Sequence, residues 1–167
     1  MRIYLRNILR FLVVVLIQVL VFENIQIGGS ISPYVYVIFI LLLPFETTGW
    51  VLLITSFLLG LSVDILLLSP GFHASASVFM AALRPFVLQS LSPRDGYEPG
   101  TFPRVYYYGL SWFARYTLIL VFAHHFFLFS LEIFRFSHIL LIFSKTIINT
   151  LISSIIIIIS QFFVFRK

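Results

Sequence analysis

Long apolar runs separated by short polar breaks form the main pattern of this chain. A helix needs about 20 predominantly apolar residues to cross a bilayer, and the pattern predicts six such helices. They are expected at about residues 8–24, 33–45, 50–68, 72–91, 108–129 and 139–164. Turn-forming residues mark the breaks, as in Gly28-Gly29-Ser30 and Ser69-Pro70-Gly71. The most polar segment, residues 92–105, predicts a loop between the fourth and fifth helices.

The first two runs differ from an ordinary membrane helix. Arg2, Arg6 and Arg10 precede the first run as in a secretory signal, but no small-x-small cleavage motif follows it, so we expect an uncleaved helix. The second run begins with residues that favour a helix start, namely Ser32 as a cap and Pro33 in the first turn. Its length of about 13 residues is short for a helix that crosses a bilayer.

The positions of the basic residues predict the orientation, because cytoplasmic loops carry an excess of Lys and Arg. With the N-terminus inside, the inner side holds eight of them: Arg2, Arg6, Arg10, Arg84, Arg94, Arg104, Arg166 and Lys167. Only Arg135 is expected outside, while Arg115 and Lys145 lie within helices. The sequence therefore predicts an all-α integral membrane protein with one domain, residues 1–167. It would be a compact bundle of six transmembrane helices with both termini cytoplasmic.

The composition supports a membrane location and narrows the possible functions. Charged residues make up 10% of the 167 residues, against about 25% in soluble domains, and the mean hydropathy is +1.08. These values exclude soluble enzymes and nucleic-acid readers, so the net charge of +5 reflects topology rather than nucleic-acid binding. Because the chain has no cysteine, disulfides and thiolate zinc sites are excluded as well.

Polar residues inside the predicted helices are the functional candidates, because burying them in a membrane is costly unless they are paired or solvated. In the third helix, Ser56, Gly60 and Asp64 are spaced four residues apart and share one face, which suits close helix packing. The sixth helix carries a comparable polar stripe formed by Lys145, Asn149, Ser153 and Ser160.

Depth along the helices, at about 1.5 Å per residue, brings several of these groups to one level in the outer leaflet. We expect a cluster of Asp64, Lys145, His73 and one of His124 and His125, since adjacent helical residues point in different directions. An Asp64–Lys145 pair would either order the bundle or contact another protein or a ligand. His73, at the start of the fourth helix, would either stabilise the turn or have a functional role.

Arginines are expected at the cytoplasmic face, namely Arg84, Arg94 and Arg104. Arg84 lies too far along the fourth helix to pair with Asp64. Beside Pro85 it predicts a side chain that extends to the headgroups next to a helix kink. Arg115 either reaches the headgroups or pairs inside, depending on where the fifth helix begins.

Catalytic motifs are lacking: the chain has no H-E-x-x-H, no phosphate-binding glycine loop and no paired intramembrane aspartates. One buried carboxylate does not provide both an acid and a base, and a metal site would need three converging ligands without cysteine. We therefore expect no enzyme activity, no cofactor and no metal.

Segments of the third and fourth helices carry a family resemblance. Gly60-Leu61-Ser62-Val63-Asp64 is followed by Gly71-Phe72-His73-Ala74, and Leu83-Arg84-Pro85-Phe86 precedes the loop Ser92-Pro93-Arg94-Asp95-Gly96-Tyr97-Glu98. With six predicted helices and both ends inside, the sequence resembles the MreD family of rod shape-determining proteins along nearly its whole length. The resemblance implies a bacterial inner-membrane location and a non-enzymatic role in cell-wall elongation.

The resemblance also implies partners within the elongation complex. These are the periplasmic coiled-coil protein MreC, the actin-like MreB, the glycosyltransferase RodA and a class B penicillin-binding transpeptidase. The expected polar cluster, together with Ser56, Gly60 and Asn149, would then be a place to bind or orient the single helix of MreC. Beyond these proteins we expect contact with the lipid bilayer and none with nucleic acid.

A substrate-binding component of an energy-coupling-factor-type transporter is the alternative function. Such proteins also have about six helices in a short chain, and His73, His124 and Asn149 could line the outward cavity that one would need. The small residues of 74–82 could pack against an energising partner. An intramembrane enzyme is a third possibility, which the missing catalytic motifs disfavour.

Overall fold

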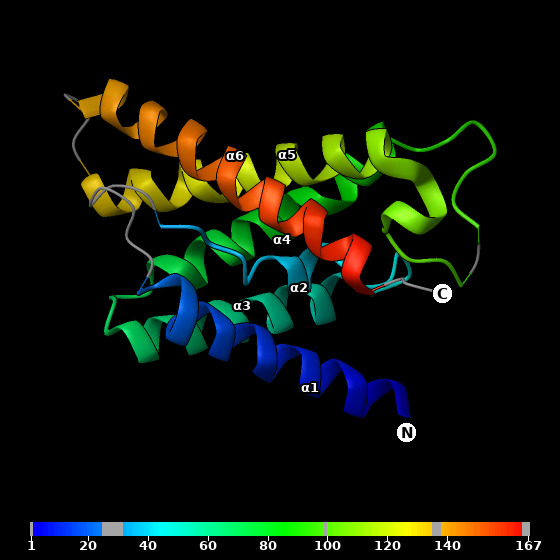
Figure 1. Ribbon diagram of the computed structural model, residues 1–167, viewed down its shortest axis with the longest axis horizontal. Helices are drawn as coiled ribbons and strands as arrows, with labels where there is room; N and C mark the ends of the chain where they lie inside the picture. The colour runs from blue at the N-terminus through cyan, green and yellow to red at the C-terminus, as the bar shows by residue number, and fades with distance from the viewer. Residues whose placement is uncertain (1, 25–31, 99, 135–137, 165–167) are drawn as a thin grey trace.

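A computed structural model describes residues 2–24, 32–98, 100–134 and 138–164 (Figure 1). Its helices are α1 (Arg2–Ile17), the π-helical η1 (Gln18–Phe22), α2 (Ile38–Leu41), α3 (Gly49–Leu67), α4 (Phe72–Ser90), α5 (Val105–Ile133) and α6 (Ile139–Val164). No β-strand occurs in these ranges. The predicted break at Gly28-Gly29-Ser30, the side chains of Arg2 and Arg6, Arg135 and the pair Arg166-Lys167 lie outside the described part.

Within the described residues, three helices are long and apolar enough to cross a membrane: α3, α5, and α6 over Ile139–Phe163. A shorter apolar helix, Asn7–Phe22, comprises most of α1 and all of η1. α4 is less apolar because it packs between α3 and α5 and directs small and polar side chains toward them (Figure 1). The chain thus has the helical architecture of a membrane protein.

The long helices run between two ends of the bundle (Figure 1). α1, α3 and α5 begin at the end where α6 finishes, which we call the proximal end. The α3–α4 turn and the C-terminal end of α5 lie at the opposite, distal end. The 92–104 loop, which joins α4 to α5, lies at the proximal end.

Residues 33–45 do not form the predicted spanning helix. Residues 32–35 are extended and α2 adds a single short helix, so that residues 32–44, which we call the central segment, run through the middle of the bundle (Figure 1). Its enclosed side chains include Tyr36, Val37, Ile40 and Leu41. Length explains the conformation: an extended residue advances about 3.3 Å against 1.5 Å in a helix, so a short run reaches farther when partly extended.

Gly60 sets the crossing of α3 and α4. A Cβ atom at this position would lie 2.5 Å from the Cα atom of Ala74 and would also meet the His73 carbonyl oxygen, so only glycine fits without a shift. Gly71, with a φ of 92°, completes the turn between the two helices. The predicted small-residue face of α3 is therefore the surface on which α4 begins.

α5 contains a break near its start. Gly109 has a φ of 80° and a ψ of 166°, which no helical residue adopts, so a short helical turn precedes the straight part of the helix. After this break α5 continues to Ile133 and packs along both α4 and α6. Two of its faces are consequently covered, which matters for the histidines described below.

Candidate functional site

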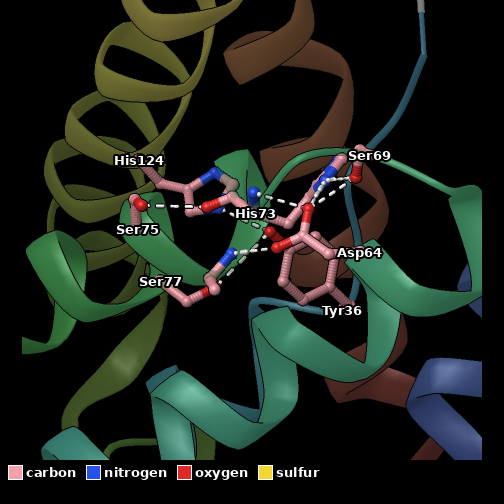
Figure 2. A network of polar contacts seen from close by, with 9 residues as sticks. Tyr36, Asp64, Ser69, His73, Ser75, Ser77 and His124 are labelled. Atoms are coloured by element: carbon pink, nitrogen blue, oxygen red, sulfur yellow. Dashed lines mark hydrogen bonds and ion pairs between the residues drawn. The ribbon is translucent and has the colours of Figure 1, made fainter.

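The Asp64 carboxylate is the centre of a polar network at the distal end (Figure 2). It accepts hydrogen bonds from the Ser69 hydroxyl at 2.5 Å, the His73 backbone N–H at 3.1 Å and the Ala74 backbone N–H at 2.8 Å. α4 begins at Phe72, so these N–H groups belong to its first turn, where intrahelical partners are lacking. Because the cap position of α4 is Gly71, which has no side chain, Asp64 supplies the cap from α3.

His73 belongs to the same network. Its Nδ1 atom lies 3.0 Å from an Asp64 carboxylate oxygen and 3.2 Å from the Ser69 hydroxyl. The imidazole ring packs against Tyr34, with ring centroids 5.4 Å apart, and against Tyr36 at 6.0 Å. These contacts describe a side chain that stabilises the α3–α4 turn, which is one of the two roles expected for His73, and whose ring also packs against the central segment.

His124 and His125 are both fully buried, so the expectation that only one of them faces inward is wrong. The Nε2 atom of His124 is hydrogen-bonded to the Tyr36 hydroxyl at 2.7 Å, and Ser77 donates to that hydroxyl at 3.5 Å (Figure 2). His125 Nδ1 lies 2.9 Å from the Val121 carbonyl oxygen. Adjacent positions are both enclosed because α5 is covered by α4 and the central segment on one side and by α6 on the other.

The expected Asp64–Lys145 pair is not formed in the described structure. The Asp64 oxygens are occupied by Ser69, His73 and Ala74, and the one ion pair recorded there is between Asp64 and His73. The Lys145 ammonium lies 5.8 Å from the centroid of the Phe129 ring instead. Depth along a helix predicts the level of a side chain but not its direction around the axis, which is why the pairing was wrong.

Side chains from α6 and η1 hold the backbone of the central segment. Asn149 accepts a hydrogen bond from the Ser32 N–H at 2.9 Å, and the Ser153 hydroxyl accepts one from the Tyr34 N–H at 3.0 Å. Gln18 accepts from the N–H groups of Val35 and Tyr36 and donates to the Pro33 carbonyl oxygen at 3.1 Å. The α6 stripe therefore satisfies extended backbone, which in a membrane is tolerated only when buried and hydrogen-bonded.

Gln18 belongs to this set of hydrogen bonds, although the pattern of polar positions did not predict it. It is 1% exposed and is the single strongly polar side chain in the apolar stretch of residues 11–22. That isolation was the available signal, since a lone amide among lipid-facing residues needs hydrogen-bond partners. Its three bonds to the central segment provide them.

Arg84 is buried, so the prediction that its side chain extends to the headgroups is wrong. It is 1% exposed. Its Nε atom donates to the Tyr116 hydroxyl at 2.8 Å, and Nη2 donates to the carbonyl oxygens of Leu43 and, at 3.4 Å, Pro44. Tyr116 in turn donates to the Leu41 carbonyl oxygen at 3.0 Å. The guanidinium is thus the cap for the carbonyl groups that follow α2.

Aromatic side chains hold the 92–104 loop against the proximal end by packing and hydrogen bonding. Tyr97 stacks on Phe45 with centroids 4.2 Å apart, and its hydroxyl donates to the Leu88 carbonyl oxygen at 2.7 Å. The Trp112 indole donates to the Leu91 carbonyl oxygen at 2.9 Å. Burial raises the pKa of the Tyr97 hydroxyl to about 12.

The remaining predicted residues divide into buried and exposed groups. Ser56 and Asn149 are fully buried, and Gly60 lies beneath α4, so these positions face the interior of the molecule. Arg94 is exposed on the loop, and Arg104 is partly buried with its guanidinium 5.3 Å from the centroid of the Phe102 ring. Arg115 is exposed and donates to the Ser111 carbonyl oxygen at 3.3 Å.

The site is therefore a set of internal hydrogen bonds that fix a turn and an extended segment. Three histidine nitrogens remain without a partner among the described residues: Nε2 of His73, Nδ1 of His124 and Nε2 of His125. In the same part of the chain, no group of three or more His, Asp and Glu side chains is arranged to hold a metal ion. Comparison of the chain with family models, curated proteins and solved structures found no match.

Proposed function

We propose that this chain is a multi-pass protein of the bacterial inner membrane that takes part, without catalysis, in lateral cell-wall elongation and maintenance of rod shape. The proposal comes from the resemblance to the MreD family. One observation supports it most directly: the motif residues Gly60, Asp64, Gly71, His73 and Ala74 meet at a single point of the fold. Hydrophobic composition alone would not bring a glycine, a carboxylate and two backbone N–H groups together in this way.

The proposed topology has six crossings with both termini cytoplasmic. The central segment would be the second crossing, because its extended part allows a short run to pass between the two ends. The proximal end would face the cytoplasm, since α1 begins there and the loop with Arg94 and Arg104 lies there too. The distal network around Asp64 would then lie in the outer half of the membrane.

Partner helices would contact the outward faces of the bundle rather than the polar cluster. Ser56, Gly60 and Asn149 are covered by other parts of this chain, so they are not available to the helix of MreC. Contact with MreC would use apolar lipid-facing side chains, while the exposed loop around Arg94 would be open to the cytoplasmic partners MreB and RodA. The polar cluster would act indirectly, by holding the helices that carry these faces.

One observation favours the transporter alternative. The unpartnered nitrogens of His73, His124 and His125 lie in one aromatic cluster with Tyr34, and such groups could bind a polar molecule. The three histidines are nevertheless buried, at most 4% exposed as whole residues, so they do not line an open cavity. The burial makes the cell-wall role the better supported of the two functions.

The test is purification of the tagged chain in mild detergent from a rod-shaped bacterium that depends on it. We expect MreC to co-purify, and we expect depletion of the chain to turn rods into spheres. Gly49→Ala should restore rods, since nothing lies within 4 Å of that position, whereas Gly60→Ala should not. Cells that stay rod-shaped after depletion would refute the proposal, and recovery of a transporter ATPase in place of MreC would support the alternative.

A further inference from the structure

We propose that a groove between α1 and α3 binds one aminophospholipid from the leaflet at the proximal end. The groove has a volume of about 860 Å³. It is lined by Phe11 of α1, by Leu58 of α3, and by Phe39 and Leu43 of the central segment. An apolar channel with these walls accepts a hydrocarbon chain without leaving any polar group unpaired.

The length of the groove favours a lipid over the helix of another protein. Along α3 it extends from Thr48 to Leu58, and ten residues of helix span about 15 Å. That is about half of a hydrocarbon core about 30 Å thick. A transmembrane helix would need a contact face along the whole core, whereas an acyl chain occupies one leaflet. The length of the groove therefore matches the thickness of a single leaflet.

The mouth of the groove has charges that match a zwitterionic headgroup. Glu46 lines it with an exposed carboxylate, which accepts a hydrogen bond from the Gly100 N–H at 3.4 Å and suits the ammonium group of phosphatidylethanolamine. α3 begins next to it at Gly49, and the Thr48 side chain makes no capping hydrogen bond, so the first N–H groups of α3 are open to a phosphate oxygen. Amine and phosphate each meet the complementary charge at the end where the acyl groove opens.

This inference goes beyond the proposed function, although it rests on the chain spanning a membrane. It does not depend on which protein the chain binds. Lipid retention is measured on the purified chain alone, so its failure is distinguishable from failure of the role in cell shape. A chain that binds MreC but no lipid would overturn only this inference.

The experiment is native mass spectrometry of the full chain in detergent, titrated in turn with phosphatidylethanolamine, phosphatidylcholine and phosphatidylglycerol of identical acyl chains. Phosphatidylcholine lacks N–H donors, and phosphatidylglycerol lacks the amine. We expect one phosphatidylethanolamine to bind about tenfold more tightly than either, the equivalent of about 1.4 kcal/mol. Glu46→Gln should remove this preference while leaving overall lipid binding in place. Because Glu46 is exposed, the substitution should not change the fold.

Two tryptophan variants test the position of the acyl chain. Thr55→Trp fills the groove, while Leu53→Trp places the same indole on the other side of α3, outside the groove. Binding of phosphatidylethanolamine should fall at least tenfold in the first variant and stay unchanged in the second. Equal binding of all three lipids, equal loss in both tryptophan variants, or a preference that survives Glu46→Gln would each overturn the proposal.

Discussion

The substitution Asp64→Asn tests the central contact of the fold. It keeps one oxygen, which can still accept the bonds from the Ser69 hydroxyl and the His73 N–H, but it replaces the other with an NH2 group, which cannot accept the bond from the Ala74 N–H. Losing one charge-assisted hydrogen bond and leaving its buried donor unpaired should lower the free energy of unfolding by about 2–4 kcal/mol. Ser69→Ala, which removes a single donor, should cost about 1 kcal/mol.

The measurement is reversible unfolding of the purified protein in mixed micelles, with Lys145→Met as the matched control. Because Lys145 does not contact Asp64 in the described structure, Lys145→Met should cost less than about 0.5 kcal/mol and should add independently to Asp64→Asn. The charge-swapped double variant Asp64→Lys with Lys145→Asp should be no more stable than Asp64→Lys alone. A coupling energy above about 1 kcal/mol, or recovery of stability by the swap, would refute the assignment of Asp64 to the start of α4.

Three further predictions concern other contacts. Gly60→Ala should destabilise the α3–α4 crossing by about 1–3 kcal/mol in the same unfolding assay, because the added Cβ meets backbone, while Gly49→Ala should be neutral. Arg84→Lys should cost about 2–4 kcal/mol, since one ammonium cannot replace the guanidinium between the Tyr116 hydroxyl and the carbonyl oxygens after α2; a thermal shift equal to that of wild type would contradict this. Tyr97 should favour the folded state below pH 10 and lose that contribution as pH rises from about 10 to about 12, because its pKa is raised in the fold. Tyr97→Phe should therefore remove part of the fall in stability over that range, as followed by tyrosinate absorbance and unfolding.

The helix positions could be predicted because hydrophobic runs and turn residues report local structure. The turn at Ser69-Pro70-Gly71 lies between α3 and α4 as expected, and those helices match the predicted runs 50–68 and 72–91 within one residue at each end. The second run could not be predicted in the same way. Its apolar composition fits a helix as well as an extended segment. In the described structure the extended backbone is stabilised because its N–H groups donate hydrogen bonds to Gln18, Asn149 and Ser153, which lie far away in the sequence.

The sequence predicted the depth of the candidate site residues in the bundle, but not the direction in which each side chain points from its helix. Asp64, His73 and His124 do lie in one cluster around the central segment, because depth follows from counting residues along each helix. Lys145 was assigned to it wrongly and His125 was left open, since the direction of a side chain depends on how each helix is rotated against its neighbours. Tyr34 and Tyr36 are core residues because the segment that carries them is interior.

The two strongly buried charges, Asp64 and Arg84, are of opposite sign and do not contact each other. His73, which hydrogen-bonds Asp64, precedes Arg84 by eleven residues on α4, a separation of about 16 Å. Each charge instead meets helix-end groups of opposite polarity: the carboxylate binds N–H groups at the start of α4, and the guanidinium binds carbonyl groups after α2. Aligned peptide dipoles make the first positive and the second negative. An apolar bundle can therefore hold both charges without an ion pair between them, and for this reason replacing either one should leave buried backbone groups at a helix end without a hydrogen-bond partner.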